Sequence, residues 1–424
     1  MPLGTPHTDV DALRAGFAAQ MHAVGTRAPI QRLGVAVSGG GDSMALLRLA
    51  QDWAQRHQKT LLVATVDHGL RPQAADEAAM VARCATRLGL PHQTLEWRGW
   101  DRHGNLQDNA REARKRLLSQ WAQAHALDAV ALGHTLDDQA ETLLMRLARG
   151  SGVEGLSGMA AHHVAQGTTW LRPLLGMGRA QLRAYLRALR ETWVDDPSNH
   201  DTSFDRVKAR QALDYLAPLG LDAKRLGQTA DRMRAARTSL DFLADAQAAK
   251  ILTVEHGDFI FDARELDALP QDTRTRLAAH ALQAISGNAY RPRLDALHAA
   301  LHSTSRTTLH GCVLSRSKGA LRVTREYSAV TRLRAPIGAT WDGRWRVQPV
   351  SAPPDNAHDL HIAALGPDGA NQCRPRSDWR VPYASLLASP AVWQGTTLIA
   401  APLAMQNCGW QAESYHIWPR MRIS

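Results

Sequence analysis

Three consecutive glycines flanked by hydroxyl and carboxylate side chains form the segment of this sequence best suited to chemistry on phosphates. The segment is Ser38-Gly39-Gly40-Gly41-Asp42-Ser43, and it follows the apolar run Leu33 to Val37. Glycines allow backbone N–H groups to close around a phosphate, and a helix that begins after them adds the positive end of its dipole. Ser38 and Ser43 can donate to phosphate oxygens, and Asp42 can hold a magnesium ion. We therefore predict a phosphate-binding turn over residues 38–43.

The spacing of this turn separates it from two common nucleotide-binding loops. No lysine follows the glycines, so the sequence does not match the G-x-x-x-x-G-K-[ST] loop of enzymes that transfer a γ-phosphate. The glycines also do not supply the G-x-G-x-x-G fingerprint of dinucleotide-binding folds. A glycine-rich turn with a purely structural role remains the alternative.

A cluster of carboxylates follows a second apolar run, in the segment Gly133 to Thr142. On a helix, Asp137 and Asp138 would lie within one turn of Glu141, because residues three and four apart share a face. Adjacent aspartates at a helix N-terminus are also ordinary caps, which is the alternative interpretation. At the same sheet edge as the glycine turn, we predict that this cluster binds a metal or orients a substrate.

Two further segments carry candidate site residues. His68 follows the apolar run that ends at Val66, and we predict that it lines the nucleotide pocket, although simple packing in a turn is the alternative. Arg111 and Arg114 share one face of a predicted helix, where they can stabilise charge on a transferred adenylyl group or form a solvated face. Seven more arginines could follow an RNA backbone: Arg172, Arg179, Arg183, Arg187, Arg190, Arg206 and Arg210.

The elements that must position these residues follow from the apolar pattern. We predict strands over Leu33–Val37, Leu61–Val66, His92–Trp97 and Ala129–Gly133, with helices over Ser43–Arg56, Ala74–Leu88 and Gln107–Ala124. This alternation predicts a doubly wound parallel sheet of the α/β class, covered by helices on both faces. Such sheets bind ligands beyond the carboxyl ends of their strands, where the three candidate segments lie.

The rest of the chain predicts two more domains. An Arg-rich stretch after residue 177, broken by the polar turn Asp195–Asn199, indicates that the first domain covers 1–217. Long Leu and Ala runs with the helical period predict a mostly helical domain over 218–332, with a hairpin at Lys318-Gly319 near its end. Short β-prone pieces predict a small α+β domain over 333–424.

Composition narrows the class of protein. The 424 residues contain 50 Lys and Arg against 40 Asp and Glu, and the net charge of +10 fits a polyanionic partner such as a nucleic acid. Four dispersed cysteines without a C-x-x-C pair disfavour a disulfide framework or a cysteine-rich zinc site. We expect no membrane span and no secretory signal, and therefore a cytoplasmic protein.

Taken together, the motifs resemble a known family. The glycine turn resembles the pyrophosphatase loop of the N-type ATP pyrophosphatases, or PP-loop superfamily, which splits ATP into AMP and pyrophosphate. Over residues 32–210 the chain more specifically resembles the tRNA(Ile)-lysidine synthase family. The resemblance is carried by S-G-G-G-D-S at 38–43, V-D-H-G-L-R at 66–71, N-L-Q-D-N-A-R-E-A-R at 105–114, G-H-T-L-D-D-Q-A-E-T at 133–142, G-L-S-G-M at 155–159, R-P-L-L at 172–175 and W-V-D-D-P-S-N at 193–199.

This resemblance implies an activity. ATP would adenylate the C2 oxygen of the wobble cytidine in the CAU anticodon of an isoleucine tRNA, and the amine of free lysine would displace AMP. The resemblance assigns ATP binding to residues 38–43 and His68, with magnesium at Asp42 and Asp138. It makes Asp42, Asp137, Arg111 and Arg114 catalytic, and it assigns tRNA or lysine contacts to His134, Glu141 and Arg206. The two C-terminal domains would bind the tRNA.

The chain departs from the family pattern at two positions, and three other functions remain as alternatives. Lys115 and Val207 stand where the family usually has an aromatic residue and an asparagine. A tRNA thiolase of the same superfamily would need reactive or cluster-binding cysteines, but the predicted first domain contains only Cys84. A non-catalytic RNA-binding homologue would be expected to have lost Asp42 or Asp138. An amide synthetase would need an ammonia source, and no glutaminase domain is recognisable.

Overall fold

The computed structural model describes residues 10–26, 29–69, 73–98, 106–195, 204–288, 290–351, 359–373, 376–405, 409–415, 418 and 421. Its chain divides into two compact units, residues 1–237 and residues 238–423. The division falls inside one long helix, α9 (Ala223–Ile251). The domain boundaries that the sequence suggests at 217 and 332 stay predictions.

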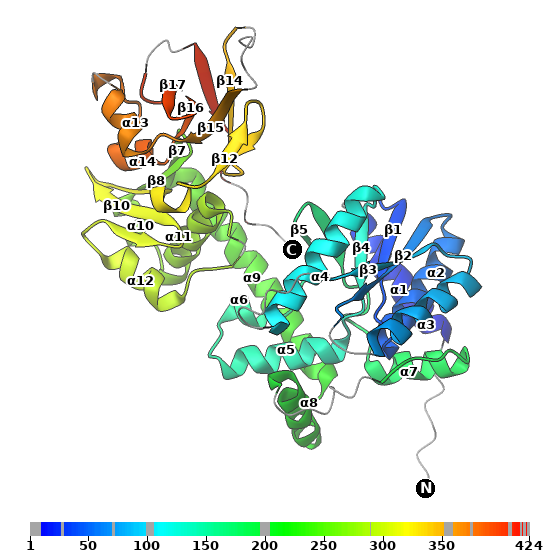
Figure 1. Ribbon diagram of the computed structural model, residues 1–424. Helices are drawn as coiled ribbons and strands as arrows, with labels where there is room; N and C mark the ends of the chain where they lie inside the picture. The colour runs from blue at the N-terminus through cyan, green and yellow to red at the C-terminus, as the bar shows by residue number, and fades with distance from the viewer. Residues whose placement is uncertain are drawn as a thin grey trace. The chain divides into compact units, whose positions relative to one another are not determined.

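The first unit is built on a six-stranded sheet (Figure 1). Its strands are β1 (Arg32–Ala36), β2 (Thr60–Asp67), β3 (His92–Glu96), β4 (Ala129–Leu132), β5 (His162–Ala165) and β6 (Thr168–Leu171). The order is β3-β2-β1-β4-β6-β5, and every neighbouring pair is parallel except β5 with β6. The strand order reverses between β1 and β4, and at such a switch point an α/β sheet binds its ligand. This confirms the predicted doubly wound sheet.

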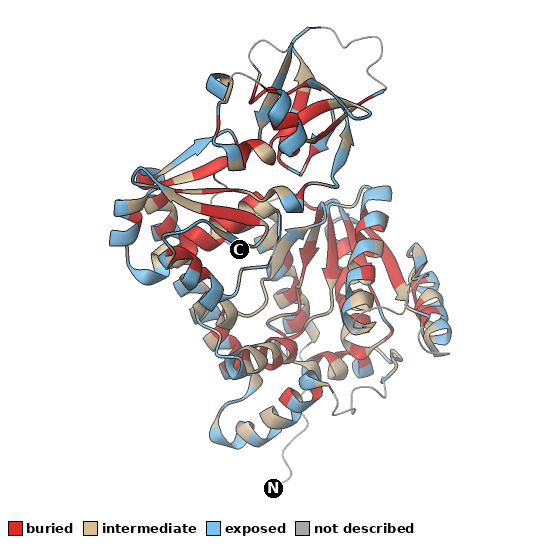
Figure 2. Ribbon diagram, turned by 60° about the vertical axis from the view of Figure 1, so that its left-hand side comes forward, coloured by how far each residue is buried: buried red, intermediate tan, exposed pale blue. Residues whose placement is uncertain are grey.

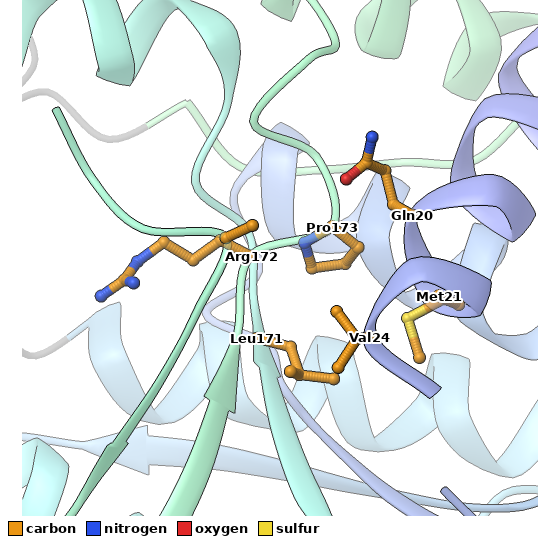
Figure 3. Close-up of a pocket in the computed structure, with 7 residues that line it drawn as sticks. Gln20, Met21, Val24, Leu171, Arg172 and Pro173 are labelled. Atoms are coloured by element: carbon orange, nitrogen blue, oxygen red, sulfur yellow. The ribbon is translucent and has the colours of Figure 1, made fainter. Parts of the chain in front are cut away.

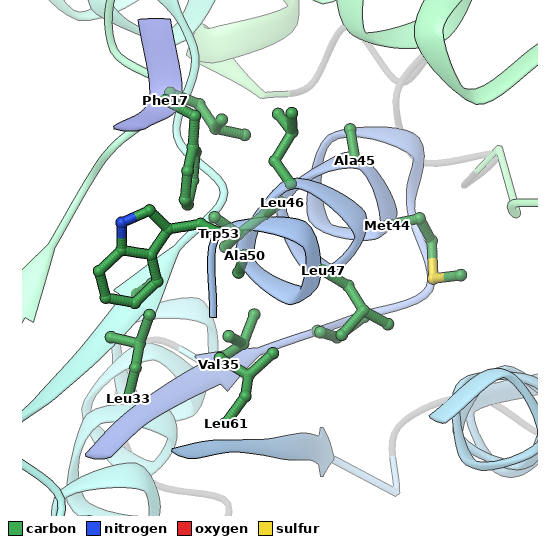
Figure 4. Packing of buried hydrophobic residues seen from close by; sticks show 14 of the residues in the cluster. Phe17, Leu33, Val35, Met44, Ala45, Leu46, Leu47, Ala50, Trp53 and Leu61 are labelled. Carbon is green, nitrogen blue, oxygen red and sulfur yellow. The ribbon is translucent and has the colours of Figure 1, made fainter. Parts of the chain in front are cut away.

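Helices cover both faces of this sheet. Those of the first unit are α1 (Val10–Gly25), α2 (Gly41–Arg56), α3 (Gln73–Arg87), α4 (Leu106–Ala124), α5 (Leu136–Ala148), α6 (Val153–Leu156), α7 (Arg179–Ala188) and α8 (Asp205–Leu216). On one face, Leu33 and Val35 of β1 pack with Phe17 of α1 and Trp53 of α2 (Figure 4). On the other face, Trp121 of α4 packs against the intervening strand residues. Alternate residues of each strand therefore serve two cores.

Three elements of this unit go beyond the sequence prediction. Helix α1 packs Leu13, Phe17 and Met21 against the sheet, at the four-residue spacing of a buried helix face. Strands β5 and β6 form a hairpin at the edge of the sheet. The predicted strands and helices are otherwise confirmed, with ends shifted by up to two residues.

The second unit begins with helices around a five-stranded sheet. The elements are β7 (Leu252–Glu255), β8 (Asp258–Asp262), α10 (Ala263–Ala268), α11 (Gln271–Ser286), α12 (Leu294–His302), β9 (Thr307–Leu309), β10 (Cys312–Ser317) and β11 (Ala320–Arg325). The sheet order is β7-β8-β11-β10-β9. The predicted hairpin is confirmed: Lys318 and Gly319 both have positive φ, as a two-residue turn with type I′ geometry requires. The helices were expected, but the full sheet around the hairpin was not.

The C-terminal part of this unit has its own hydrophobic cluster and two antiparallel sheets. Its elements are β12 (Arg334–Pro336), β13 (Thr340–Trp341), β14 (Trp345–Pro349), β15 (Leu360–Ala364), α13 (Gly366–Gln372), α14 (Tyr383–Leu387), β16 (Pro390–Gln394), β17 (Thr397–Ala400) and β18 (Trp410–Ser414). One sheet has the order β12-β15-β16-β17 and the other β13-β14-β18. Trp341, Val347 and Ile362 lie in the cluster. The α+β character of this stretch is as predicted.

Buried residues gather along the strands and on the inner sides of the helices (Figure 2). Of the helices in the described part of the chain, none is long and apolar enough to cross a membrane.

Candidate active site

The glycine turn after β1 is closed by hydrogen bonds of its two serines. The Ser43 hydroxyl donates to the Gly40 carbonyl at 2.9 Å and accepts from the Ser38 backbone N–H at 3.1 Å. The two hydroxyl oxygens lie 3.2 Å apart. Gly39 has a φ of 87°, a left-handed conformation that a residue with a Cβ atom adopts at a cost. In this structure the serines therefore hold the shape of the turn.

The N-terminus of α2 opens onto this turn without a side-chain cap. Gly40 is the N-cap residue and has no side chain that could accept from the first N–H groups of the helix. Such unsatisfied N–H groups, with the helix dipole behind them, bind anions. A segment distant in the sequence also fixes the turn: the Val194 N–H donates to the Gly39 carbonyl at 3.0 Å. The geometry is that of a phosphate site.

Asp42 lies in the first turn of α2, and its two carboxylate oxygens have different surroundings. Its Oδ2 accepts from the Arg179 Nε at 3.0 Å, whereas its buried Oδ1 has no hydrogen-bond partner among the described residues. Burial raises the pKa of the Asp42 carboxyl above its ordinary value, and Arg179 opposes that rise. A buried, unpaired carboxylate oxygen beside a phosphate site is suited to a cation that arrives with the phosphate.

Strand β4 brings the second motif against the first. A Cβ atom at Gly133 would lie 3.2 Å from the backbone nitrogen and Cα of Ser43, so a larger residue there would push the two backbones apart by a few tenths of an ångström. The next residue, His134, has a buried Nδ1 to which no described residue is hydrogen-bonded. Burial and the cations of Arg172, Arg114, Arg206 and Arg111 hold the pKa of His134 well below its ordinary value. His134 is therefore a neutral imidazole at pH 7.

The carboxylates of the second motif begin helix α5 through a capping box. Thr135 is the N-cap, and its hydroxyl accepts from the Asp138 N–H while Asp138 Oδ2 accepts from the Thr135 N–H at 2.8 Å. Asp138 Oδ1 accepts from Arg179 and from Arg206, each at 3.0 Å. Both oxygens of Asp138 are thus used within the protein. This capping role is the alternative interpretation that the sequence allows for the adjacent aspartates.

Glu141 lies one turn further along α5 and is completely buried. Its carboxylate accepts from Arg206 Nε at 2.7 Å, Arg210 Nε at 2.9 Å and Arg179 Nη1 at 3.3 Å. Arg206 and Arg210 belong to α8, so this carboxylate ties three helices together. A buried carboxylate with three arginine partners favours the one arrangement of α5, α7 and α8 in which all three contacts form. Contact of Glu141 with tRNA or lysine would require these arginines to move.

Asp137 keeps one oxygen available. Its Oδ2 accepts from the Arg179 backbone N–H at 2.6 Å, and no described residue donates to its Oδ1. The side chain is half-buried at the start of α5. Of the carboxylates on α5, Asp137 is the one with a free acceptor at the surface of the site.

Arg111 and Arg114 lie on α4 and have no carboxylate partner among the described residues. Burial and the neighbouring Arg111 lower the pKa of the Arg114 guanidinium. Arg172, at the end of β6, donates to the Ala160 carbonyl at 2.8 Å and lies 3.1 Å from His163 Nδ1. Burial, Arg111 and Arg146 lower the pKa of Arg172 to about 10. Cations without a carboxylate partner among the described residues, such as the exposed Arg111 and the partly buried Arg114, favour an anionic ligand.

His68 follows β2 at the same edge of the sheet. Its ring meets Trp97 edge-on, with centroids 5.8 Å apart, and its Nδ1 is buried without a partner. Burial and Arg114 lower the pKa of His68. The remaining residues of that motif, Leu70 and Arg71, and the polar turn at 196–199 lie outside the described residues.

The two departures from the family pattern lie away from the glycine turn. Lys115 pairs with Glu112 on the surface of α4 at 2.6 Å. Val207 is buried in the first turn of α8. Neither side chain contacts the carboxylate cluster through a polar group.

Of the two predicted magnesium ligands, Asp42 has an available carboxylate oxygen and Asp138 has none. The described residues contain no group of three or more His, Cys, Asp or Glu side chains arranged to hold a metal. Magnesium in nucleotide sites is usually held by one or two carboxylates together with phosphates and water. Asp42 Oδ1 can supply such a ligand, whereas Asp138 has both oxygens engaged.

A small hollow lies between α1 and the end of β6 (Figure 3). Its empty volume is about 180 Å³, which is below that of ordinary ligand pockets. Leu171, Pro173, Met21 and Val24 line it, and the Arg172 side chain extends away from them (Figure 3). We assign the hollow to imperfect packing rather than to ligand binding.

The predicted residues therefore gather at one sheet edge, and three arginines have unexpected partners. The carboxyl ends of β1, β2 and β4 bring together the turn at 38–43, His68, His134 and Asp137. The arginines of α4 lie beside them. Arg179 and Arg210, which the sequence suggested for RNA contacts, bind carboxylates instead. Arg206 does the same.

These features define a class. Residues 13–215 match the family described as a PP-loop domain. The parallel sheet, the S-G-G-G-D-S turn and the uncapped α2 define an ATP-binding domain of the PP-loop class.

Proteins that are similar to this chain over most of its length identify its family. A tRNA(Ile)-lysidine synthase from Ruegeria pomeroyi is 47% identical over 412 residues, covering 95% of this chain and 94% of that protein. One from Bradyrhizobium diazoefficiens is 44% identical, over 63% of this chain and 77% of that protein. One from Wolbachia pipientis wMel is 33% identical, over 74% of this chain and 76% of that protein. The chain belongs to the tRNA(Ile)-lysidine synthase family.

Among solved structures, a U34-tRNA thiolase from Methanococcus maripaludis matches with a TM-score of 0.45 and 16% identity, covering 53% of this chain and 80% of that chain. The three cysteines among the described residues do not suit sulfur transfer. Cys84 is buried, and burial and Glu191 raise the pKa of its thiol. Cys312 and Cys373 are also buried, in the other unit.

Proposed function

We propose that the protein ligates free lysine to C2 of the wobble cytidine in the CAU anticodon of an isoleucine tRNA. One observation carries the proposal: an uncapped phosphate turn lies at the same sheet edge as arginines that have no carboxylate partner among the described residues. This combination suits a reaction in which pyrophosphate leaves and an adenylyl group is transferred. The family to which the chain belongs supplies the identity of the substrates.

The reaction would proceed in two steps. The C2 oxygen of cytidine attacks the α-phosphorus of ATP, the bond to the β-phosphate oxygen breaks, and pyrophosphate leaves. The lysine amine then attacks C2, the bond to the adenylyl oxygen breaks, AMP leaves and the amine loses a proton. A C2 oxygen is a poor leaving group, and AMP is a good one, which is the reason for the adenylation. A single-stranded anticodon base can enter such a site.

Each predicted residue has a place in this scheme. The N–H groups at 39–43 would bind the β- and γ-phosphates of ATP, which leave as pyrophosphate, with His68 beside the nucleotide. Arg111 and Arg114 would stabilise charge at the α-phosphate in both steps. Asp137 would receive the lysine amine through its unoccupied Oδ1. His134 would contact the tRNA or lysine as a neutral ring.

Magnesium would be held by Asp42 through Oδ1 and would neutralise phosphate charge when bound. Asp138 and Glu141 would act through Arg179 and Arg206, by holding α5, α7 and α8 together around the site. The second unit would select the tRNA, and the reaction would take place in the cytoplasm, where that tRNA is found.

The experiment is to incubate the protein with ATP, magnesium, radiolabelled lysine and an isoleucine tRNA transcript that bears CAU. The methionine tRNA with the same anticodon is the matched control. Label in the isoleucine tRNA alone is the expected result. Pyrophosphate release without lysine incorporation would reject lysine as the nucleophile, and incorporation into both tRNAs would reject selection beyond the anticodon.

A further inference from the structure

Arg179 connects the glycine turn to the acidic end of α5. We propose that Arg179 is a positioning residue for ATP: it holds Asp42 by Oδ2 and thereby presents Oδ1 to the phosphate site. This inference rests on the use of the glycine turn for ATP in the proposed function. It assigns a part in ATP binding to an arginine whose sequence context suggested an RNA contact.

The guanidinium of Arg179 divides its nitrogens among three carboxylates. Nε donates to Asp42 at 3.0 Å, Nη2 to Asp138 at 3.0 Å and Nη1 to Glu141 at 3.3 Å. A planar guanidinium bound on all of its nitrogens has no freedom to rotate. Its side chain is only 17% exposed, so water competes little for these contacts.

The backbone of Arg179 is fixed as well. Its N–H donates to Asp137 Oδ2 at 2.6 Å, and it is the first residue of α7. The preceding residue, Gly178, is held by the Gln181 side chain at 3.2 Å. Both ends of the arginine are therefore tied to α5, and Asp42 is the one partner that lies on α2.

The two oxygens of Asp42 then have separate tasks. A carboxylate with no fixed partner rotates about χ2 and presents either oxygen. Here Oδ2 is engaged by Arg179, and the buried Oδ1 is left without a partner beside the uncapped turn. A group that fixes this rotation prepares the carboxylate before ATP arrives, which lowers the cost of binding.

The test uses an ATP analogue that cannot be cleaved between the α- and β-phosphates, with its affinity measured by calorimetry in the presence of magnesium. Loss of a charge-assisted hydrogen bond predicts that Arg179→Met weakens binding about tenfold or more. Arg179→Lys should be intermediate, because an ammonium is a point charge that cannot bind three carboxylates in this geometry. Arg187→Met, an exposed arginine on the same helix, should bind the analogue like the wild type.

A double-mutant cycle with Asp42→Asn separates positioning from a general structural effect. In the Asp42→Asn background, Arg179→Met should change the affinity less than about twofold, because there is no charged oxygen to present. An equal loss in both backgrounds would overturn the proposal, as would wild-type affinity of Arg179→Lys if Arg179→Met does not fold. The assay contains neither tRNA nor lysine, so failure of lysine transfer and failure of this inference are separate results.

Discussion

The α-carbon of Gly133 faces the backbone of Ser43 so closely that an added Cβ atom would lie 3.2 Å from the Ser43 nitrogen. The residue after strand β4 and the first turn of helix α2 therefore meet backbone to backbone at this point. This contact sets the distance between the phosphate turn and the residues that follow β4.

Gly133→Ala should weaken ATP binding. Overpacking of a tight contact costs about 1–3 kcal/mol, and we expect that cost to appear as an affinity about tenfold lower. The check is calorimetry with the uncleavable ATP analogue. Gly176→Ala is the matched control, because a Cβ atom there has no neighbour within 4 Å. Equal affinities for Gly133→Ala and the wild type would contradict the role given to this contact.

Arg114→Met should lower the rate of lysine transfer while leaving ATP affinity nearly unchanged. Removal of one group that stabilises transition-state charge costs about 10² to 10³ in kcat. Lys115→Met is the control: it is the next residue on the same helix, and its ion pair within the described part of the chain is with Glu112. Single-turnover transfer with labelled lysine gives the rate. If both variants slow the reaction to the same extent, Arg114 has no special role.

Cys84→Ala should retain lysine transfer. The thiol is buried, and burial raises its pKa, so it is neither accessible nor ionised at neutral pH. We expect a stability loss of about 1 kcal/mol from the small cavity and a transfer rate within about twofold of the wild type. A folded variant with no activity would return the sulfur-transfer alternative to consideration. Circular dichroism establishes the folding.

His163 should make the first unit less stable in acid. Burial, Arg172 and Lys115 lower the pKa of His163 to about 4. The unfolded chain then binds more protons than the folded one between about pH 6.5 and pH 4, so stability falls as the pH is lowered through that window. His163→Gln should show a smaller decrease in Tm from pH 7 to pH 5 than the wild type.

The control for this measurement is His57→Gln, which removes an exposed imidazole at the end of α2. Its decrease in Tm should equal that of the wild type. A decrease for His163→Gln as large as the wild-type value would show that His163 does not carry the acid sensitivity. Thermal melts followed by tryptophan fluorescence at the two pH values provide the comparison.

Arg276→Met should strongly destabilise the second unit. Arg276 of α11 donates to Asp241 of α9 at 2.7 Å, and their side chains are 2% and 6% exposed. Removal of one partner from a buried ion pair costs about 3–5 kcal/mol, because the other charge stays buried. Urea unfolding measures the loss. The double variant Arg276→Met with Asp241→Leu should recover most of it, and a double variant as unstable as the single one would contradict this account.

The sequence predicts the elements that local chemistry determines. The glycine turn, the strands that flank it and the helix N-terminus at Leu136 are specified by apolar runs and turn residues close together in the chain. The four-residue spacing of Leu13, Phe17 and Met21 also indicates helix α1. The Thr135-x-x-Asp138 pattern contains the capping box in the same way.

The pairing of the arginines has no comparable local signal. Arg179 and Asp42 are 137 residues apart, and Arg206 and Glu141 are 65 apart. An Arg-rich stretch in a basic protein fits a solvated or RNA-binding surface equally well. Only the fold decides which arginines turn toward carboxylates and which, like Arg114, have no carboxylate partner among the described residues.

The distribution of the carboxylate partners along the chain also bears on how the protein is made. Asp42, Asp138 and Glu141 emerge from the ribosome well before Arg179, Arg206 and Arg210. A nascent chain that ends before α7 contains the complete glycine turn, but its acidic residues lack every counter-charge found in the finished cluster. The smallest fragment that can assemble this site during translation therefore extends through Arg210.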